Sequence, residues 1–169
     1  MNPNPFAWSF RLQFLLGFLI CAALLAYAVF AQYGQMFEPC PLCIFQRMAM
    51  AATGLVGLLG SLHAPKGAFG RRVYGLLAFL AAGTGAAIAA RHVWLQHLPP
   101  DQVPTCGPGL GYMLESMPSY LDVVRKVLAG SGECAEINWT LWGFSMPEWT
   151  LLCFALLAVG ALVAGFRRR

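Results

Sequence analysis

Two cysteines separated by two residues, Cys40 and Cys43, mark the stretch of this sequence best suited to chemistry. They lie in Glu-Pro-Cys-Pro-Leu-Cys-Ile-Phe-Gln-Arg, residues 38–47, where a polar segment gives way to an apolar one. Arg47 follows Cys43 by four residues, so a helix starting here would carry both on one face. The free backbone N–H groups of a helix start and a nearby guanidinium both favour thiolate over thiol. The stretch therefore predicts a redox-active pair in which the pKa of Cys43 is lowered.

A second pair, Cys106 and Cys134, lies much later in the chain. Gly-Pro-Gly follows Cys106 and Gly-Ser-Gly precedes Glu133 and Cys134, so we expect both in flexible backbone that lets a sulfur change partners. The remaining two cysteines, Cys21 and Cys153, fall inside apolar stretches, where a thiol behaves as a small hydrophobe. We assign them no role.

The elements that position these thiols are apolar blocks long enough to cross a membrane. Only 11% of the residues are charged and 59% are hydrophobic, whereas a soluble domain carries about a quarter charged residues. A transmembrane helix needs roughly 20 apolar residues, and in lipid such a span must be helical. Four blocks meet this requirement: residues 12–31, 44–62, 73–90 and 149–166. The predicted fold class is an all-α integral membrane protein, a four-transmembrane-helix bundle forming a single domain, residues 1–169.

The charge pattern sets the expected orientation. Basic residues flank the spans on one side, and all seven acidic residues fall on the other. By the positive-inside rule, both termini and the short 63–72 loop face the cytoplasm, and the loops 32–43 and 91–148 face outward. The net charge of +4 is explained by this topology, which excludes a nucleic-acid-binding function. Residues 119–129 predict a short amphipathic helix in the long loop, followed by a Gly-Ser-Gly stop. The seven basic residues on the cytoplasmic side are Arg11, Lys66, Arg71, Arg72 and Arg167 to Arg169.

Four of the six cysteines thus lie on the outward side, and three interpretations are open. Two static disulfides could fasten the loops together, the pairs could pass electrons by thiol–disulfide exchange, or four thiolates could hold zinc. Zinc is the least favoured, because one pair is spread across a long loop. A Cys-x-x-Cys bridge closes too small a loop to stabilise much. Arg47 favours exchange, since a charge inside a span is costly and usually functional.

These motifs together resemble the disulfide bond formation protein B family, DsbB. The resemblance rests on the four spans, on Cys-Pro-Leu-Cys followed by Ile-Phe-Gln-Arg, and on two further cysteines in the second outer loop. It also includes Gly-Glu-Cys-Ala-Glu-Ile-Asn-Trp, residues 132–139, and Met-Pro-Glu-Trp, residues 146–149. The similarity extends over nearly the whole chain.

The resemblance implies a protein-dithiol:quinone oxidoreductase of the bacterial inner membrane. A periplasmic thioredoxin-fold partner, DsbA, would attack a Cys106–Cys134 disulfide at Cys106, and electrons would pass to Cys40–Cys43 through an inter-loop Cys40–Cys134 disulfide. Cys43 as thiolate would contact the quinone, ubiquinone or menaquinone, and Arg47 would stabilise both. His92, at the outer end of the third span, matches a family position near the quinone.

Two alternatives remain open from the sequence. The chain could be a related oxidase that serves one dedicated partner, or a non-enzymatic membrane scaffold held by permanent disulfides. Thiol trapping separates them, because a scaffold keeps two closed bridges while an oxidase accumulates a mixed disulfide with its partner.

Overall fold

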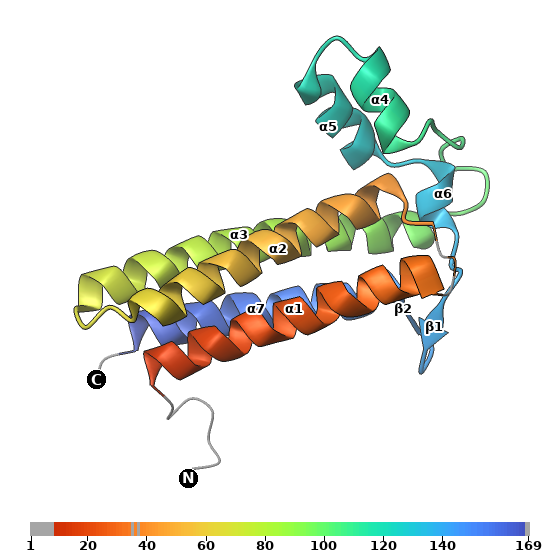
Figure 1. Ribbon diagram of the computed structural model, residues 1–169. Coiled ribbons are helices and arrows are strands. Elements are labelled where there is room, and N and C mark those ends of the chain that lie inside the picture. Colours follow the sequence, from red (N-terminus) through yellow and green to blue (C-terminus); the bar gives the residue numbers. More distant parts are fainter. Residues whose placement is uncertain (1–8, 35, 37, 168–169) are drawn as a thin grey trace.

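Four long helices form the body of the protein. The structure, a computed structural model, describes residues 9–34, 36 and 38–167; Arg168 and Arg169 of the expected basic terminus lie outside these residues. The four helices are α1 (Phe10–Gly34), α2 (Pro41–His63), α3 (Ala68–Gln96) and α7 (Met146–Phe166), and each is long and apolar enough to cross a membrane. Each contains one of the predicted apolar blocks, and the predicted four-helix fold class is confirmed (Figure 1).

Local sequence explains where the two helices next to the cysteines begin. Cys40 is the N-cap of α2, with extended backbone, and Pro41 occupies the first turn, where its fixed φ and missing N–H cost nothing. At the start of α7 the Glu148 carboxylate accepts a hydrogen bond from the Ser145 N–H at 2.6 Å, as the capping-box spacing of these two residues requires. The Ser145 hydroxyl donates to Gln96 Oε1 at 2.7 Å. This bond ties the outer end of α3 to the start of α7.

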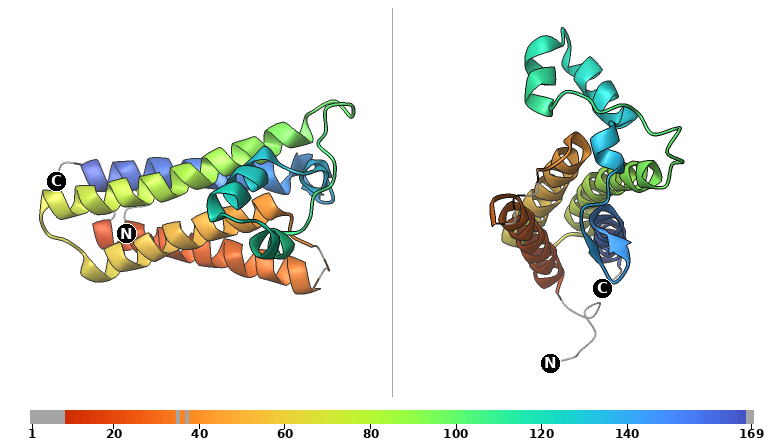
Figure 2. Two further views of the ribbon diagram at one scale, coloured as in Figure 1. Left: turned by 90° about the horizontal axis from the view of Figure 1, so that it is seen from above. Right: turned by 90° about the vertical axis from the view of Figure 1, so that its right-hand side faces the viewer.

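Small residues let the helices approach closely. Helix α3 packs along α7, and α2 packs along α1 and α3. A Cβ placed on Gly75 would lie 2.8 Å from the Cα of Gly165 in α7, so the two backbones touch there, as small-residue helix interfaces in membranes do. Viewed along the bundle, the four helices surround a common centre (Figure 2).

The long outer segment folds into short elements at one end of the bundle. They are α4 (Leu110–Ser116), α5 (Tyr120–Ala129), α6 (Gly132–Ala135) and a hairpin of β1 (Thr140–Leu141) and β2 (Phe144–Ser145). Helix α5 coincides with the predicted amphipathic helix, and its buried Val123 and Val127 pack in one cluster with Leu42 of α2. The sequence did not predict α4, α6 or the hairpin. These elements set the position of the second cysteine pair.

The two ends of the bundle differ in charge. The start of α1, the turn between α2 and α3, and the end of α7 lie together at the end opposite to α4–α6 and the hairpin (Figure 1). The basic residues Arg11, Lys66, Arg71, Arg72 and Arg167 belong to these segments. All the acidic residues lie in or beside the segments at the other end, and Cys40, Cys43, Cys106 and Cys134 belong to that end too. The grouping expected from the sequence is therefore present in three dimensions.

Candidate active site

The two cysteines of the Cys-x-x-Cys stretch face each other at the start of α2. The Cys40 thiol donates to Cys43 Sγ at 2.9 Å, and Cys40 Sγ accepts from the Cys43 N–H at 3.3 Å. Both sulfurs are free thiols in this structure. Because Cys40 is the N-cap and Cys43 lies in the first turn, the pair sits where unpaired N–H groups of the helix start are available.

A histidine and a glutamine complete this group from within the bundle. His92 of α3 places Nε2 3.9 Å from Cys40 Sγ. On its other side His92 Nδ1 lies 3.0 Å from Gln46 Nε2. Both side chains are buried, with 3% of His92 and 6% of Gln46 exposed. The structure therefore brings His92, predicted from sequence, to the thiol pair, and adds Gln46, which was not predicted.

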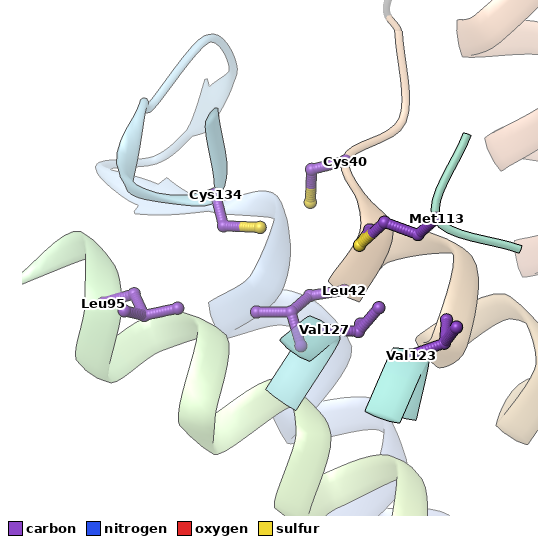
Figure 3. Packing of buried hydrophobic residues seen from close by; sticks show 7 residues of the cluster. All are labelled: Cys40, Leu42, Leu95, Met113, Val123, Val127 and Cys134. Carbon is purple, nitrogen blue, oxygen red and sulfur yellow. The ribbon is translucent and has the colours of Figure 1, made fainter. Parts of the chain in front are cut away.

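Cys134 approaches the pair from α6. Its sulfur interacts with the Cys40 thiol, with Ser131 and with the Leu42 backbone, and Figure 3 shows Cys134 and Cys40 directed into the same space above Leu42. The hydrogen bond from Cys40 is the largest cause that lowers the pKa of Cys134 to about 6, and the Ser131 and Leu42 contacts act in the same direction. The pKa of Cys40 is raised, because its proton is held by the sulfurs of Cys134 and Cys43 and because the side chain is buried. Cys134 is thus prepared to be a thiolate and Cys40 a thiol.

Cys106 lies apart from this group and is exposed. Its segment runs beside α6, where the Gly132 N–H donates to Thr105 O at 3.2 Å. A Cβ on Gly132 would lie 3.2 Å from Cys106 Sγ. Cys134, by contrast, lies in the short helix α6 with 1% of its surface exposed. The flexible backbone expected for both cysteines is therefore not found at Cys134. Cys106 is the outer member of the pair and Cys134 the inner one.

Arg47 points to α1 from the face of α2 that carries Cys43. Its guanidinium donates to Gln32 Oε1 and, at 3.0 Å, to the Ala28 carbonyl. These bonds satisfy the charge near the outer end of α1, where burial without partners would be costly. Arg47 therefore links α1 to α2, and the effect expected on the pKa of Cys43 stays a prediction.

A cavity of about 350 Å³ adjoins the thiol pair. It is partly open to the surroundings, and its wall is mostly apolar, with a few polar groups from α2, α3 and the segment before α7. That size and composition are typical of sites for small organic molecules. The predicted residues that line it are Cys40, Cys43, Arg47 and His92, and Gln46 and Cys153 line it as well. The structure thus brings four of the six predicted site residues to one cavity. Of the other two, Cys134 contacts Cys40 without lining the cavity, and Cys106 lies outside it.

Gln46 carried a signal in the sequence that could have been used. It is a polar residue within an apolar span, three residues after Cys43 and therefore on the same helical face. Its partner His92 is 46 residues away, so their pairing follows only from the packing of α2 against α3.

Comparisons with known proteins identify the family of the chain. The family model for "Disulfide bond formation protein DsbB" matches residues 10–164. A protein of Xanthomonas campestris pv. campestris named "Disulfide bond formation protein B" is 55% identical over 166 residues, covering 98% of this chain and 96% of the relative. Relatives with the same name from Chromohalobacter salexigens and Xylella fastidiosa are 54% and 46% identical, covering 88% and 97% of this chain and 86% and 94% of their own lengths. The family model covers nearly the whole bundle, and four helices can span a membrane. This chain therefore belongs to the DsbB family of disulfide bond formation proteins and is a multi-pass membrane protein.

Proposed function

We propose that this protein is a protein-dithiol:quinone oxidoreductase. It oxidises the dithiol of a periplasmic thioredoxin-fold partner of the DsbA type and passes the two electrons to a membrane quinone. The observation that carries the proposal is the position of Cys43, which faces Cys40 at 2.9 Å and lines the cavity at the start of a membrane-spanning helix. A thiol so placed can exchange with other thiols on one side and reach a lipid-soluble molecule on the other.

The outer cysteine pair provides the entry for electrons. Exposed Cys106 is accessible to a protein partner, whose thiolate attacks its sulfur in a Cys106–Cys134 disulfide and releases Cys134 as thiolate. The second thiol of the partner then displaces Cys106, which leaves as thiolate, and the partner departs as a disulfide. While Cys40 is bonded to Cys43 it has no thiol proton to donate, but Ser131 and the Leu42 backbone still act to lower the pKa of Cys134. This suits Cys134 to be the leaving group, because exchange is faster when the displaced thiol is the more acidic one.

The inner pair receives those electrons by a second exchange. Cys134 lies against Cys40, so its thiolate can attack the Cys40 sulfur of a Cys40–Cys43 disulfide and release Cys43 as thiolate. This forms a Cys40–Cys134 bridge and leaves Cys43 reduced beside the cavity. Cys106 then closes on Cys134 and restores the outer disulfide, with Cys40 leaving as thiolate. Two electrons and two protons have then moved from the partner to the inner pair.

The residues of the cavity fit a quinone. Its apolar wall suits a ring and the start of a hydrocarbon tail, and Arg47, His92 and Gln46 supply the polar groups for two ring oxygens. A bound quinone supplies the sink for two electrons and two protons that makes oxidation of the inner pair favourable. His92, 3.9 Å from Cys40 Sγ, is placed to hold or pass a proton at Nε2. The arrangement supports either ubiquinone or menaquinone.

The charge distribution supports a location in the bacterial inner membrane. Arg11, Lys66, Arg71, Arg72 and Arg167 lie at the end that carries the start of α1 and the end of α7, so that end faces the cytoplasm. The cysteine-bearing segments then face the oxidising periplasm, where disulfides persist.

The decisive experiment measures quinone reduction by purified protein supplied with a reduced thioredoxin-fold donor. Wild type should reduce quinone continuously, and Cys43→Ser should not, although its outer pair can still exchange with the donor. Cys153→Ala is the matched control, since this thiol also lines the cavity but lies away from the exchange sequence. Equal turnover by Cys43→Ser and wild type would exclude the proposed function.

A further inference from the structure

Three side chains beside the start of α2 could together bind a metal ion, a function that thiol–disulfide exchange does not need. The sulfurs of Cys40 and Cys43 and a ring nitrogen of His92 all lie within 4.8 Å of one another. Two ligands come from the start of α2 and one from α3, so the group is held by packed helices. From the sequence, a zinc site made of four thiolates was disfavoured, because one of the two cysteine pairs is spread across a long loop. The fold offers a different third ligand, a histidine.

The distances are close to those of a soft-metal site. Two thiolates on one zinc ion in tetrahedral geometry, with bonds of ~2.3 Å, lie about 3.8 Å apart, and a thiolate and an imidazole nitrogen lie about 3.6 Å apart. Here the Cys40–Cys43 sulfurs are 2.9 Å apart and Cys40 Sγ is 3.9 Å from His92 Nε2. The two sulfurs must separate by about 1 Å, which rotation of the side chains at the end of a helix allows. A Cys-x-x-Cys spacing is itself a frequent half of zinc sites.

Gln46 provides the outer support that a histidine ligand needs. A metal-bound histidine usually donates its other ring N–H to an acceptor, which fixes the ring and its tautomer. The Gln46 amide lies 3.0 Å from His92 Nδ1, and a 180° rotation of that amide presents its oxygen to an Nδ1–H. The lone pair of Nε2 then faces the sulfurs.

We propose that the reduced protein binds one thiophilic divalent cation, of the zinc and cadmium class, through Cys40, Cys43 and His92, and that the bound cation inhibits the oxidase. Binding releases the two thiol protons and changes no oxidation state. Three protein ligands leave one position for water, and the cavity beside the thiols supplies a path for entry. Soft thiolates select zinc or cadmium over magnesium and calcium.

Inhibition follows because the cation occupies the atoms that exchange uses. A metal-bound Cys43 is unavailable to the quinone, and a metal-bound Cys40 is unavailable to Cys134. The oxidised protein, with its inner pair closed, lacks two of the three ligands and should not bind. This regulatory part rests on the proposed function, whereas the binding site does not.

The binding test is a cadmium titration of the full-length, phosphine-reduced protein in detergent micelles, monitored by the ultraviolet thiolate-to-cadmium charge-transfer band. Wild type should bind one equivalent, and both Cys40→Ser and Cys43→Ser should lose the band. His92→Asn should bind at least about tenfold more weakly. Cys106→Ser and His97→Asn are matched controls outside the ligand set and should bind as wild type does.

The outcomes separate the site from the function. Absence of the band, its retention in both inner-cysteine variants, or unchanged affinity in His92→Asn would overturn the three-ligand site. In a parallel assay, zinc should inhibit quinone reduction and a chelator should restore it, and full activity with zinc bound would overturn the inhibition. Failure of metal-free wild type to reduce quinone would instead overturn the proposed function, and the cadmium titration would still decide the site.

Discussion

Gln46 Nε2 lies 3.0 Å from His92 Nδ1, and both side chains are buried between α2 and α3. The bond joins the helix that carries Cys43 to the helix that carries the histidine. A buried imidazole whose Nδ1 has a fixed partner keeps one tautomer and one ring orientation, which decides whether Nε2 gives or takes a proton. Gln46 is therefore a positioning residue for His92.

Replacing Gln46 should damage quinone use more than thiol exchange. In Gln46→Leu the buried Nδ1 of His92 loses its partner, which costs about 1–3 kcal/mol and frees the ring to turn. We expect kcat for quinone reduction to fall and its pH profile to shift, while exchange of the outer pair with the donor stays normal. Gln46→Glu keeps the length of the side chain but offers Nδ1 an acceptor in place of the Nε2–H donor, so it should not restore the wild-type pH profile. An unchanged pH profile in Gln46→Leu would argue against this role.

Arg47 should act mainly on quinone binding. Its guanidinium lines the cavity while it donates to Gln32 and to the Ala28 carbonyl, so Arg47→Ala removes both a charge and a link between α1 and α2. We expect the KM for quinone to rise about tenfold, equivalent to roughly 1.4 kcal/mol of binding. Gln32→Ala is the control, because it removes one acceptor and keeps the charge. If both variants raise KM equally, the effect comes from helix position and not from the guanidinium.

The body of the fold could be predicted because lipid leaves few choices. A long apolar block such as residues 12–31 must form a helix, and four such blocks in a short chain must pack together. The outer segment obeys no such constraint. The positions of α4, α6 and the hairpin depend on contacts such as Val127 against Leu42, which join residues far apart in the chain. Only the helix at 120–129 had enough periodicity to be predicted there.

The site could be predicted in its residues but not in its geometry. Cys40, Cys43 and Arg47 are separated by helical spacing, so their common face follows from the sequence. Spacing cannot show which groups surround a charge, and Arg47 in fact bonds to α1. Nor can it show that Cys134 rests against Cys40 while Cys106 stays exposed. Those relations depend on how α6 packs over the ends of α2 and α3.

Cys134 should titrate near pH 6 in the reduced protein. The Cys40 thiol holds the pKa of Cys134 at about 6, so the thiolate is present above that pH and lost as the pH falls below it. The alkylation rate of Cys134, followed by peptide mass spectrometry, should rise through pH 6 and then level off. Cys40→Ala removes the main hydrogen bond, and the midpoint should move up toward the ordinary thiol value near 8.5. Cys106→Ala should leave it in place, whereas a wild-type midpoint at the ordinary value would contradict the prediction.

Gly132 should be needed to hold the outer pair together. A Cβ at this position would lie 2.7 Å from the Pro104 carbonyl oxygen and 3.2 Å from the Cys106 nitrogen, so an alanine must displace the segment that carries Cys106. We expect Gly132→Ala to make the Cys106–Cys134 disulfide easier to reduce by about 30 mV, a tenfold change in its equilibrium constant. Equilibration with glutathione buffers measures this. Gly109→Ala, where a Cβ meets nothing within 4 Å, should leave the potential unchanged, and an unshifted Gly132→Ala would show that the segment yields freely.

Two glycines one half-turn apart on α3 should respond in opposite directions to alanine. A Cβ on Gly85 would overlap the ring of Phe154, which is fully buried in α7. Gly85→Ala should therefore destabilise the bundle by about 1–3 kcal/mol, the usual cost of overpacking. At Gly83 a Cβ meets nothing within 4 Å, so Gly83→Ala should gain up to about 1 kcal/mol from helix propensity. Unfolding in detergent, followed by circular dichroism, measures both changes. Because α3 also carries His92, Gly85→Ala should reduce quinone turnover as well. Equal stability of the two variants would contradict the prediction, because it would show that α3 and α7 pack less closely at Gly85 than in the structure.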